Sequence, residues 1–224
     1  MKILCVADHK DPLIYSPNLK ERYKDVDLIL GAGDLDLDFY GYIVSVLNKP
    51  LLFIFGNHNL KYFGQYSAAK REMLYNKKFP FIFPPSFGSE YIDGKVVKRK
   101  NLIIAGLGGV RRYNNGNNQF SEKQMWLRIF KLIPKLIINK IFRGRYLDIL
   151  LTHAAPLGIH DQEDACHKGF KSFLWFLRKF SPKYLVHGHI HIYDNNQKRK
   201  TKYFNTIIIN AYNHIILDTE KIDG

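Results

Sequence analysis

Eight short apolar runs are spread over the whole sequence, and most of them are continuous rather than alternating. The runs are KILCVA, VDLILGAG, PLLFIFG, NLIIAGLG, YLDILLTH, PKYLVHGH, TIIINA and HIILD. Continuous apolar runs of this length predict strands that are buried on both faces. A chain with such strands must cover both faces of its sheets with other elements, which restricts it to layered folds.

Three helix-length segments, 36–49, 121–142 and 168–180, lie between these runs. Their alternation with the strands predicts an α/β fold with helices on both faces of a central sheet system. The last strands follow one another closely, which predicts some antiparallel pairing. Segment 84–100 should form a loop and then a hairpin that turns at its Asp-Gly pair. The length of 224 residues and the apolar content of 46% lead us to expect one domain over 1–224.

The predicted helix at 122–141 combines apolar residues at helical spacing with basic residues between them. Pro134 should kink or divide this helix. Two interpretations remain open. It is an ordinary surface helix with its apolar side inward, or a basic amphipathic helix that docks on a phosphate-rich surface. The apolar positions are Trp126, Ile129, Phe130, Ile133, Ile137 and Ile141, and the basic ones are Arg128, Lys131, Lys135 and Lys140.

The formal net charge of +14 favours acidic partners: phosphorylated small molecules, nucleic acid or an anionic membrane surface. No apolar run approaches the roughly 18 residues that a membrane span requires. The N-terminal run has no pattern of a secretory signal, and the two cysteines indicate no disulfide framework. We therefore expect a reducing, cytoplasmic setting, whereas the oligomeric state cannot be predicted.

Five of the predicted strands end in a carboxylate, a carboxamide or an imidazole. The carboxyl ends of strands form the ligand crevice of layered α/β folds, so these side chains should converge. Oxygen and nitrogen donors without a thiolate suit manganese, iron or zinc, and a carboxylate can bridge two such ions for displacement at phosphorus. The residues are Asp8, Asp34, Asn57, His58, His153, His189 and His191.

The motifs GAGD (31–34), GNH (56–58), TH (152–153) and GHIH (188–191), in this order, resemble those of the calcineurin-like metallophosphoesterases. The opening ADHKD is similar to an imperfect first motif of that family. Several inner stretches also look like a bacterial branch of mostly unknown substrate. The resemblance implies a four-layer αββα sandwich of two mixed β-sheets flanked by helices. It also implies a metal-dependent phosphoesterase that cleaves a phosphodiester or phosphomonoester with a metal-activated hydroxide.

The resemblance further implies a dinuclear centre of two divalent ions, with manganese, iron or zinc as the expected metals. Its substrate would be a phosphorylated small molecule or nucleic acid. By position in the motifs, the first ion would take Asp8 and His191, the second would take Asn57, His153 and His189, and Asp34 would bridge them. His58 would be the catalytic residue, which stabilises or protonates the leaving oxygen.

Lys10 departs from the family pattern, because it occupies the place of a metal-binding histidine. A charged lysine has no lone pair to give. A backbone bulge could bring in His9, Asp11 could supply an oxygen, or the first site could lack a ligand and bind its ion weakly. The last is favoured, since adjacent strand residues point to opposite sides. The same departure motivates an alternative function, a weakly active or inactive phosphate- or protein-binding module on the same scaffold.

Other polar residues are weaker candidates. Arg111 or Arg112, after the glycine-rich run at 105–109, could bind a phosphate oxygen. The loop that holds His160, Asp161, Asp164 and His167 could line the pocket, support the metal-binding imidazoles or form a polar surface. His187 should be structural, and Asn210 could reach the edge of the site.

Overall fold

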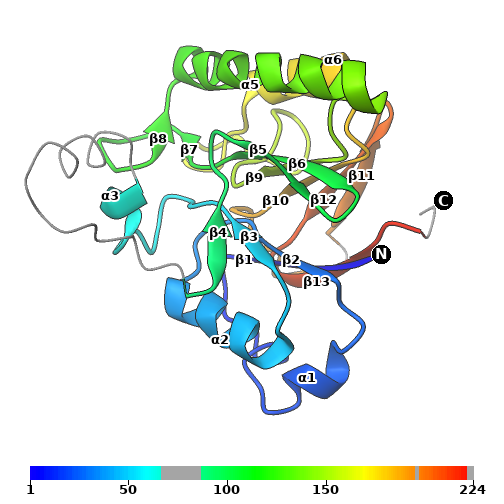
Figure 1. Cartoon of the computed structure of the whole chain (residues 1–224). Helices are drawn as coiled ribbons and strands as arrows, with labels where there is room; N and C mark the ends of the chain where they lie inside the picture. The colour runs from blue at the N-terminus through cyan, green and yellow to red at the C-terminus, as the bar shows by residue number, and fades with distance from the viewer. Residues whose placement is uncertain (67–86, 195–196, 221–224) are drawn as a thin grey trace, which may run out of the picture.

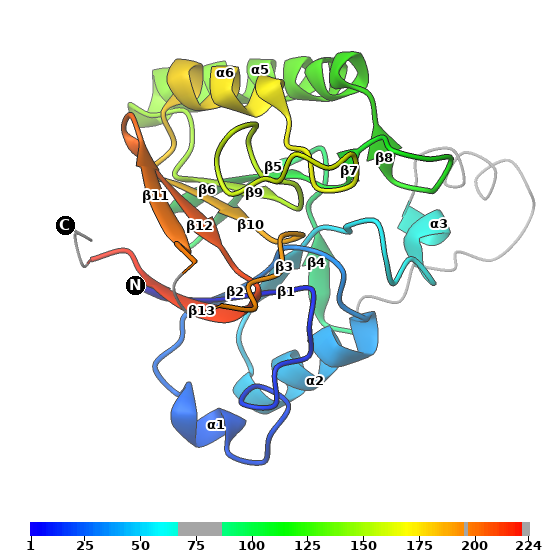
Figure 2. The same ribbon diagram turned by 180° about the vertical axis from the view of Figure 1, so that it is seen from behind.

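The chain folds as four stacked layers, in the order helix, sheet, sheet, helix (Figure 1). The computed structural model describes residues 1–66, 87–194 and 197–220. The view from behind in Figure 2 shows the same succession of layers, with the two sheets packed face to face in the middle. The αββα sandwich implied by the sequence motifs is therefore confirmed. Residues 84–86 of the predicted loop lie outside the described residues.

The first sheet has five strands in the order β13-β1-β2-β3-β4. Strands β1 to β4 are parallel, and β13 pairs antiparallel with β1. The parallel arrangement puts the carboxyl ends of β1, β2 and β3 at one edge. The bounds are β1 Lys2–Ala7, β2 Leu28–Gly31, β3 Leu51–Phe53, β4 Ser89–Tyr91 and β13 Asn213–Asp218.

The second sheet has six strands in the order β11-β12-β10-β9-β6-β5. Its four central strands are parallel, and its two edge strands are antiparallel to their neighbours. All eight predicted strands are present, and the late antiparallel pairing is confirmed. The bounds are β5 Val96–Arg99, β6 Leu102–Leu107, β9 Ile149–Thr152, β10 Tyr184–His187, β11 Lys200–Tyr203 and β12 Thr206–Asn210, with a small separate pair β7 Val110–Arg111 and β8 Gln119–Phe120.

The predicted hairpin at the Asp93-Gly94 turn is wrong. Strands β4 and β5 on either side of this turn belong to different sheets, so the turn carries the chain from one sheet to the other. The hairpin of this region is β5–β6, which turns at Lys100 with a left-handed backbone (φ +50°). Asp93 instead accepts a hydrogen bond from the Gly108 amide and pairs with Arg128. The turn is thus anchored by its carboxylate to the neighbouring layer.

Helices cover the outer faces of both sheets and create three apolar cores, one between each pair of adjacent layers. The first sheet is covered by α1 (Leu19–Arg22) and α2 (Leu37–Leu47), and the single turn α3 (Phe63–Tyr66) packs against the same apolar core. The second sheet is covered by α5 (Glu122–Arg143) and α6 (Lys171–Phe180). None of the described helices meets the length and apolarity that crossing a membrane demands.

Helix α5 runs unbroken for 22 residues, so Pro134 does not divide it. Its first turn is fixed by a capping box, in which the Ser121 hydroxyl accepts from the Gln124 amide and the Gln124 side chain accepts from the Ser121 amide. Gly144 ends the helix in a left-handed conformation. The capping box and the terminal glycine fix the two ends of the helix, and the internal proline does not break it.

Candidate metal centre

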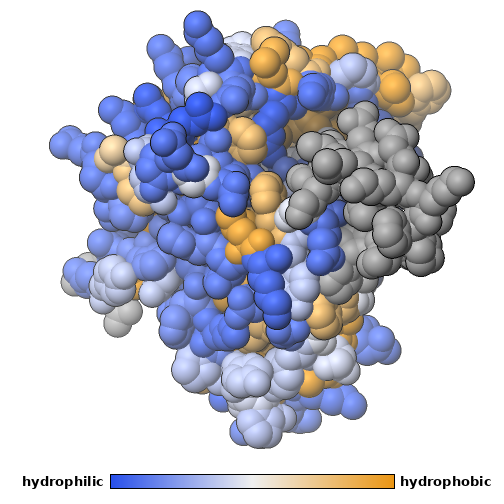
Figure 3. Space-filling view, turned by 90° about the vertical axis from the view of Figure 1, so that its left-hand side faces the viewer, coloured by the Kyte–Doolittle hydropathy of each residue, from blue (hydrophilic) through white to orange (hydrophobic). Residues whose placement is uncertain are grey.

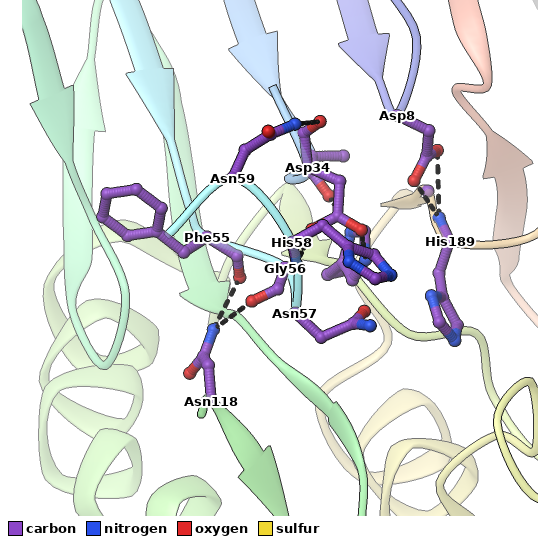
Figure 4. Close-up of polar contacts among 12 residues, drawn as sticks. Asp8, Asp34, Phe55, Gly56, Asn57, His58, Asn59, Asn118 and His189 are labelled. Carbon is purple, nitrogen blue, oxygen red and sulfur yellow. Dashed lines mark hydrogen bonds and ion pairs between the residues drawn. The ribbon is translucent and has the colours of Figure 1, made fainter. Parts of the chain in front are cut away.

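The polar residues that end the central strands converge at one edge of the two sheets (Figure 4). Asp8 follows β1, Asp34 follows β2, Asn57 follows β3, and His153 and His189 follow β9 and β10. Three of these residues adopt a left-handed backbone, with φ of +66° at Asp8, +57° at Asp34 and +68° at His189. Such conformations are uncommon for residues other than glycine and concentrate at functional sites.

Asp34 and His153 form the buried centre of this cluster. The Nδ1–H of His153 donates to the carbonyl of Ala32 at 2.7 Å, which leaves its Nε2 as the free ring nitrogen. That Nε2 lies 3.2 Å from Oδ2 of Asp34, yet it forms no aligned hydrogen bond with any described residue. A lone pair so close to a carboxylate needs a cation between or beside them, either a proton or a metal ion.

The charges of this pair support the same conclusion. Burial opposes ionisation of both groups, but their mutual attraction raises the pKa of His153 to about 9 and lowers the pKa of Asp34 to about 2. A bound metal ion would take the place of the imidazole proton. The buried Asp34–His153 pair therefore has the electrostatics of a cation site.

Asn57 adds a neutral oxygen donor. Its amide Nδ2 donates to the Tyr113 hydroxyl at 3.2 Å, while its Oδ1 is buried and has no hydrogen-bond partner among the described residues. A buried amide oxygen without a partner is rare in a folded protein. The orientation of Asn57 therefore leaves this oxygen available to a metal ion.

The loop that carries Asn57 approaches the pair closely enough to require glycine. A Cβ on Gly56 would lie 2.1 Å from Asp34 Oδ1 and 2.4 Å from His153 Nε2. The His58 amide donates to Asp34 Oδ1 at 2.7 Å, and the Asn118 side chain donates to the carbonyl of Gly56 at 2.7 Å. Asn118, which the sequence did not indicate, thus holds the loop in place.

Asp8 lies beside the pair and is fixed by the loop after β10. Both its carboxylate oxygens accept from the His189 amide, at 2.9 and 3.0 Å. A Cβ on Gly188 would come within 2.7 Å of Asp8 Oδ2, so glycine is needed there as well. Burial, with a further contribution from Asp34, raises the pKa of Asp8 to about 7. Two close carboxylates of this kind are stabilised by a cation.

His189 is oriented by the loop between β9 and α6. Its Nε2–H donates to the Cys166 carbonyl at 2.9 Å, so Nδ1 remains as the free donor atom. Burial lowers the pKa of His189 to about 3, which keeps the ring in the neutral form that binds metals. Asp34, His153 and His189 each place one donor atom within 4.8 Å of the others. The donor set fits a divalent ion of intermediate hardness.

The same loop brings two further donors to His189. One donor atom each of Cys166, His167 and His189 lie within 4.8 Å of one another. The Nδ1 of His167 hydrogen-bonds the Asp164 carboxylate at 2.9 Å, an arrangement that orients an imidazole for binding. The sequence had suggested His167 and Asp164 only as lining or support, and it gave no sign of Cys166.

His191 and His58 lie at the rim of the cluster, and both are exposed. His191 stacks on Tyr212 with ring centroids 4.8 Å apart, and its Nδ1 hydrogen-bonds the Tyr193 hydroxyl at 2.8 Å. His58 is fixed through its backbone, while its side chain faces solvent. The structure therefore brings Asp8, Asn57 and His189 around the buried Asp34–His153 pair, and it leaves His58 and His191 at the rim.

The residues after Asp8 do not replace the missing histidine. Lys10 turns towards α2 and pairs with Asp36 at 2.7 Å. Asp11 accepts from the ring of His214 at 2.6 Å and from the Leu13 amide at 2.8 Å, and His9 is exposed. In the described structure, therefore, neither His9 nor Asp11 takes the place of the missing histidine.

Arg112 and Asn210 have structural partners. Arg112 donates to the Gln124 side chain at the start of α5, and Arg111 lies half-buried on β7. Asn210 is buried and donates to the Ile190 carbonyl at 2.8 Å, so it supports the loop of the GHIH motif between His189 and His191.

His187 is fully buried in a relay with His160. The Nδ1–H of His187 donates to the Gly188 carbonyl, and the His160 Nδ1–H donates to Nε2 of His187 at 2.9 Å. The Thr201 hydroxyl completes the relay by donating to Nε2 of His160 at 2.8 Å. Every nitrogen of the two neutral rings is thereby satisfied, which agrees with the structural role predicted for His187.

A layered α/β sandwich with carboxylates and imidazoles at its strand ends defines the class of metallophosphoesterase folds. A family model described as calcineurin-like phosphoesterase matches residues 1–193, and the chain belongs to this family. The family typically binds divalent metals and acts on phosphorylated substrates.

Solved structures share the fold at low sequence identity. One crystal structure is 15% identical with a TM-score of 0.65, over 97% of this chain and 94% of that chain. The protein TT1561 of Thermus thermophilus is 13% identical with a TM-score of 0.59, over 95% of this chain and 89% of that chain. No curated protein matched the sequence.

Proposed function

We propose that the protein is a metal-dependent phosphoesterase whose two divalent ions are held by Asp8, Asp34, Asn57, His153, His189 and His191. The observation that carries this proposal is the buried approach of Asp34 Oδ2 to the free Nε2 of His153 at 3.2 Å. The buried Oδ1 of Asn57, which has no hydrogen-bond partner among the described residues, adds a third donor atom. Bound ions supply positive charge to the phosphate oxygens and lower the pKa of a coordinated water.

The side chains of the cluster would position the ions and donate the proton to the leaving group. Asp34 holds the His58 amide through one oxygen and faces His153 with the other, so it couples the two sides of the cluster. The exposed His58 imidazole stands at the rim, where a histidine can donate a proton to a leaving oxygen at neutral pH. Arg111, which lies on β7, is proposed to contact a phosphate oxygen of the substrate. Arg112 instead donates a hydrogen bond to the Gln124 side chain.

The experiment measures metal content and hydrolysis together. The protein is stripped with a chelator, reloaded with manganese, iron or zinc, and assayed on an aryl phosphodiester and an aryl phosphomonoester. We expect metal-dependent hydrolysis and up to two bound ions per chain. The proposal fails if no ion binds, or if neither aryl substrate nor a panel of phosphorylated metabolites and nucleic acids is cleaved above the chelated control. The basic charge favours phosphodiesters in this panel.

Lys10, at the place of a metal-binding histidine, motivates one alternative, a catalytically weak or inactive phosphate- or protein-binding module on the same scaffold. This module would bind phosphate without metal-dependent turnover. Metal counting separates the two functions, because the module predicts no bound ion after manganese loading. We further propose that residues 1–224 act as a single domain in a cytoplasmic setting, with a phosphorylated small molecule or nucleic acid as substrate.

A further inference from the structure

Helix α5 has two apolar faces, and only one of them packs against the core. Its inward face is formed by residues that are at most 2% exposed: Met125, Ile129, Leu132 and Leu136. On the opposite side, six large apolar side chains are between 46% and 79% exposed. We call these six the α5 outer face: Leu127, Phe130, Ile137, Ile138, Ile141 and Phe142.

The α5 outer face is one continuous stripe. Together with the exposed Pro134, which lies between Phe130 and Ile137, its members recur every three or four residues from Leu127 to Ile141, and at 1.5 Å per residue this stretch is about 21 Å long. Hydrophobic side chains gather accordingly at the upper right of Figure 3, where α5 lies. Contiguous exposed apolar surface of this kind is uncommon in a monomer and marks an interaction site.

Charge around the stripe selects the kind of partner. Helix α5 has a single acidic residue, Glu122, and its carboxylate is occupied by the Lys171 and Ser172 amides at the start of α6. A second copy of this helix would bring lysines against lysines, which disfavours a symmetric dimer. The basic residues of α5 are Lys123, Arg128, Lys131, Lys135, Lys140 and Arg143, of which Arg128 is largely buried and paired with Asp93.

An apolar stripe flanked by lysines is instead complementary to an anionic bilayer. Leu, Ile and Phe side chains enter the boundary between headgroups and acyl chains, while lysines extend to the lipid phosphates. Each basic residue near an anionic leaflet adds to the attraction. We propose that the α5 outer face docks the protein on the surface of anionic lipid bilayers, with α5 lying in the plane of the interface.

The chain's two tryptophans provide a local probe of this docking. Trp126 contacts Phe130 of the α5 outer face at 5.5 Å between ring centroids, and Trp175 of α6 packs on Trp126 at 4.8 Å. The protein is mixed with vesicles of phosphatidylglycerol and phosphatidylcholine that contain a brominated lipid, which quenches tryptophan fluorescence at short range. We expect cosedimentation and quenching that are at least about tenfold stronger than with phosphatidylcholine alone.

Two double variants and one control separate docking from misfolding. Ile141→Ser with Phe142→Ser should weaken partitioning at least about tenfold, because two of the most exposed apolar side chains are lost. Lys131→Glu with Lys135→Glu should abolish the preference for anionic vesicles and its dependence on salt. Leu13→Ser removes an apolar side chain exposed by 46% in the loop before α1, in the opposite layer, and should bind as the unchanged protein does.

Thermal unfolding of each variant checks that the fold is retained. The proposal is overturned if anionic vesicles are not bound, if neutral vesicles are bound equally well, or if Leu13→Ser weakens binding as much as the α5 variants. A dimer detected by light scattering would also overturn the proposal under two conditions. The Ile141→Ser, Phe142→Ser double variant would have to dissociate this dimer, and it would have to bind vesicles as well as the unchanged protein does. These measurements do not use phosphoesterase activity, so they stand or fall separately from the proposed reaction.

Discussion

The two halves of the candidate metal centre are built differently. In the buried half, the donor atoms of Asn57, His153 and His189 are each oriented by a hydrogen bond from the far side of the same side chain. In the open half, His191 is exposed and rests on Tyr212, and Lys10 turns away to Asp36. Preoriented ligands bind metals more tightly than ligands that must be ordered first. The two proposed ions should therefore bind with unequal affinity.

The largest effect is expected for Asp34→Asn, since Asp34 is shared by both halves. Loss of its charge leaves His153 without its carboxylate and should reduce turnover at least about a hundredfold. Metal content of the purified variant should also fall. Asp38→Asn makes the same chemical change on the exposed face of α2 and should leave both quantities unaltered. Full-rate hydrolysis by Asp34→Asn would refute the bridging role.

A loss of about a hundredfold in turnover is expected for His58→Ala, because a proton donor of this kind contributes roughly that factor. The side chain of His58 is exposed and its amide contact with Asp34 survives the substitution, so both halves should keep their ions. Elemental analysis together with steady-state kinetics makes the distinction. A variant that loses metal in proportion to activity would identify His58 as a ligand instead.

An intermediate effect is expected for Lys10→His, which tests the open half directly. An imidazole at this position restores the donor of the family motif, and we expect the weaker ion to bind about tenfold more tightly. The Lys10–Asp36 pair is half-exposed, so its loss should cost little stability. Calorimetric titration with manganese would resolve the two binding events. Lys10→Gln, which removes the charge without adding a good ligand, serves as the control.

The smallest effect concerns the His160–His187 relay, which supports β10 beneath the buried half. Burial lowers the pKa of His160 to about 4 and that of His187 to about 3. The unfolded chain therefore takes up protons first as pH falls. This contribution to stability is fully present above about pH 6.5 and is lost as pH falls towards 4.

Chemical denaturation of the chelator-stripped protein at a series of pH values measures this loss. His160→Gln removes one of the two histidines that take up a proton on unfolding. The slope of the free energy of unfolding against pH should therefore become shallower by up to about 1.4 kcal/mol per pH unit below about pH 6. An unchanged slope would show that the relay does not control the acid limit. His9→Gln, at an exposed histidine, is the matched control.

The strands were predictable because each is a continuous apolar run, and burial on both faces leaves no other arrangement for such runs. The strand partners of β4 and β5 were not predictable in this way. The Asp93-Gly94 turn has the local chemistry of a hairpin, but the two strands find their partners in different sheets. Helix α5 shows a similar limit, since residues at helical spacing lie on both its faces and the pattern alone does not say which face is inward.

The same contrast holds within the site. Asp8, Asp34, Asn57, His153 and His189 follow strands, so their position at one sheet edge could be predicted from chain order. Asn118, Tyr113 and Cys166 lie in loops or irregular segments, where no periodicity relates sequence to position. Their contacts to Gly56, Asn57 and His189 span long stretches of chain and became visible only in three dimensions.

The pairing of β1 with β13 has a consequence for biosynthesis. Lys2 is in register with Asp218, so β1 leaves the ribosome long before β13, the strand that pairs with this edge, has been made. Until then β1 presents an open edge next to Asp8, and edges of this kind recruit foreign strands. A circular permutant that joins β13 to β1 would make these two strands neighbours in translation, and it should fold faster with less aggregation.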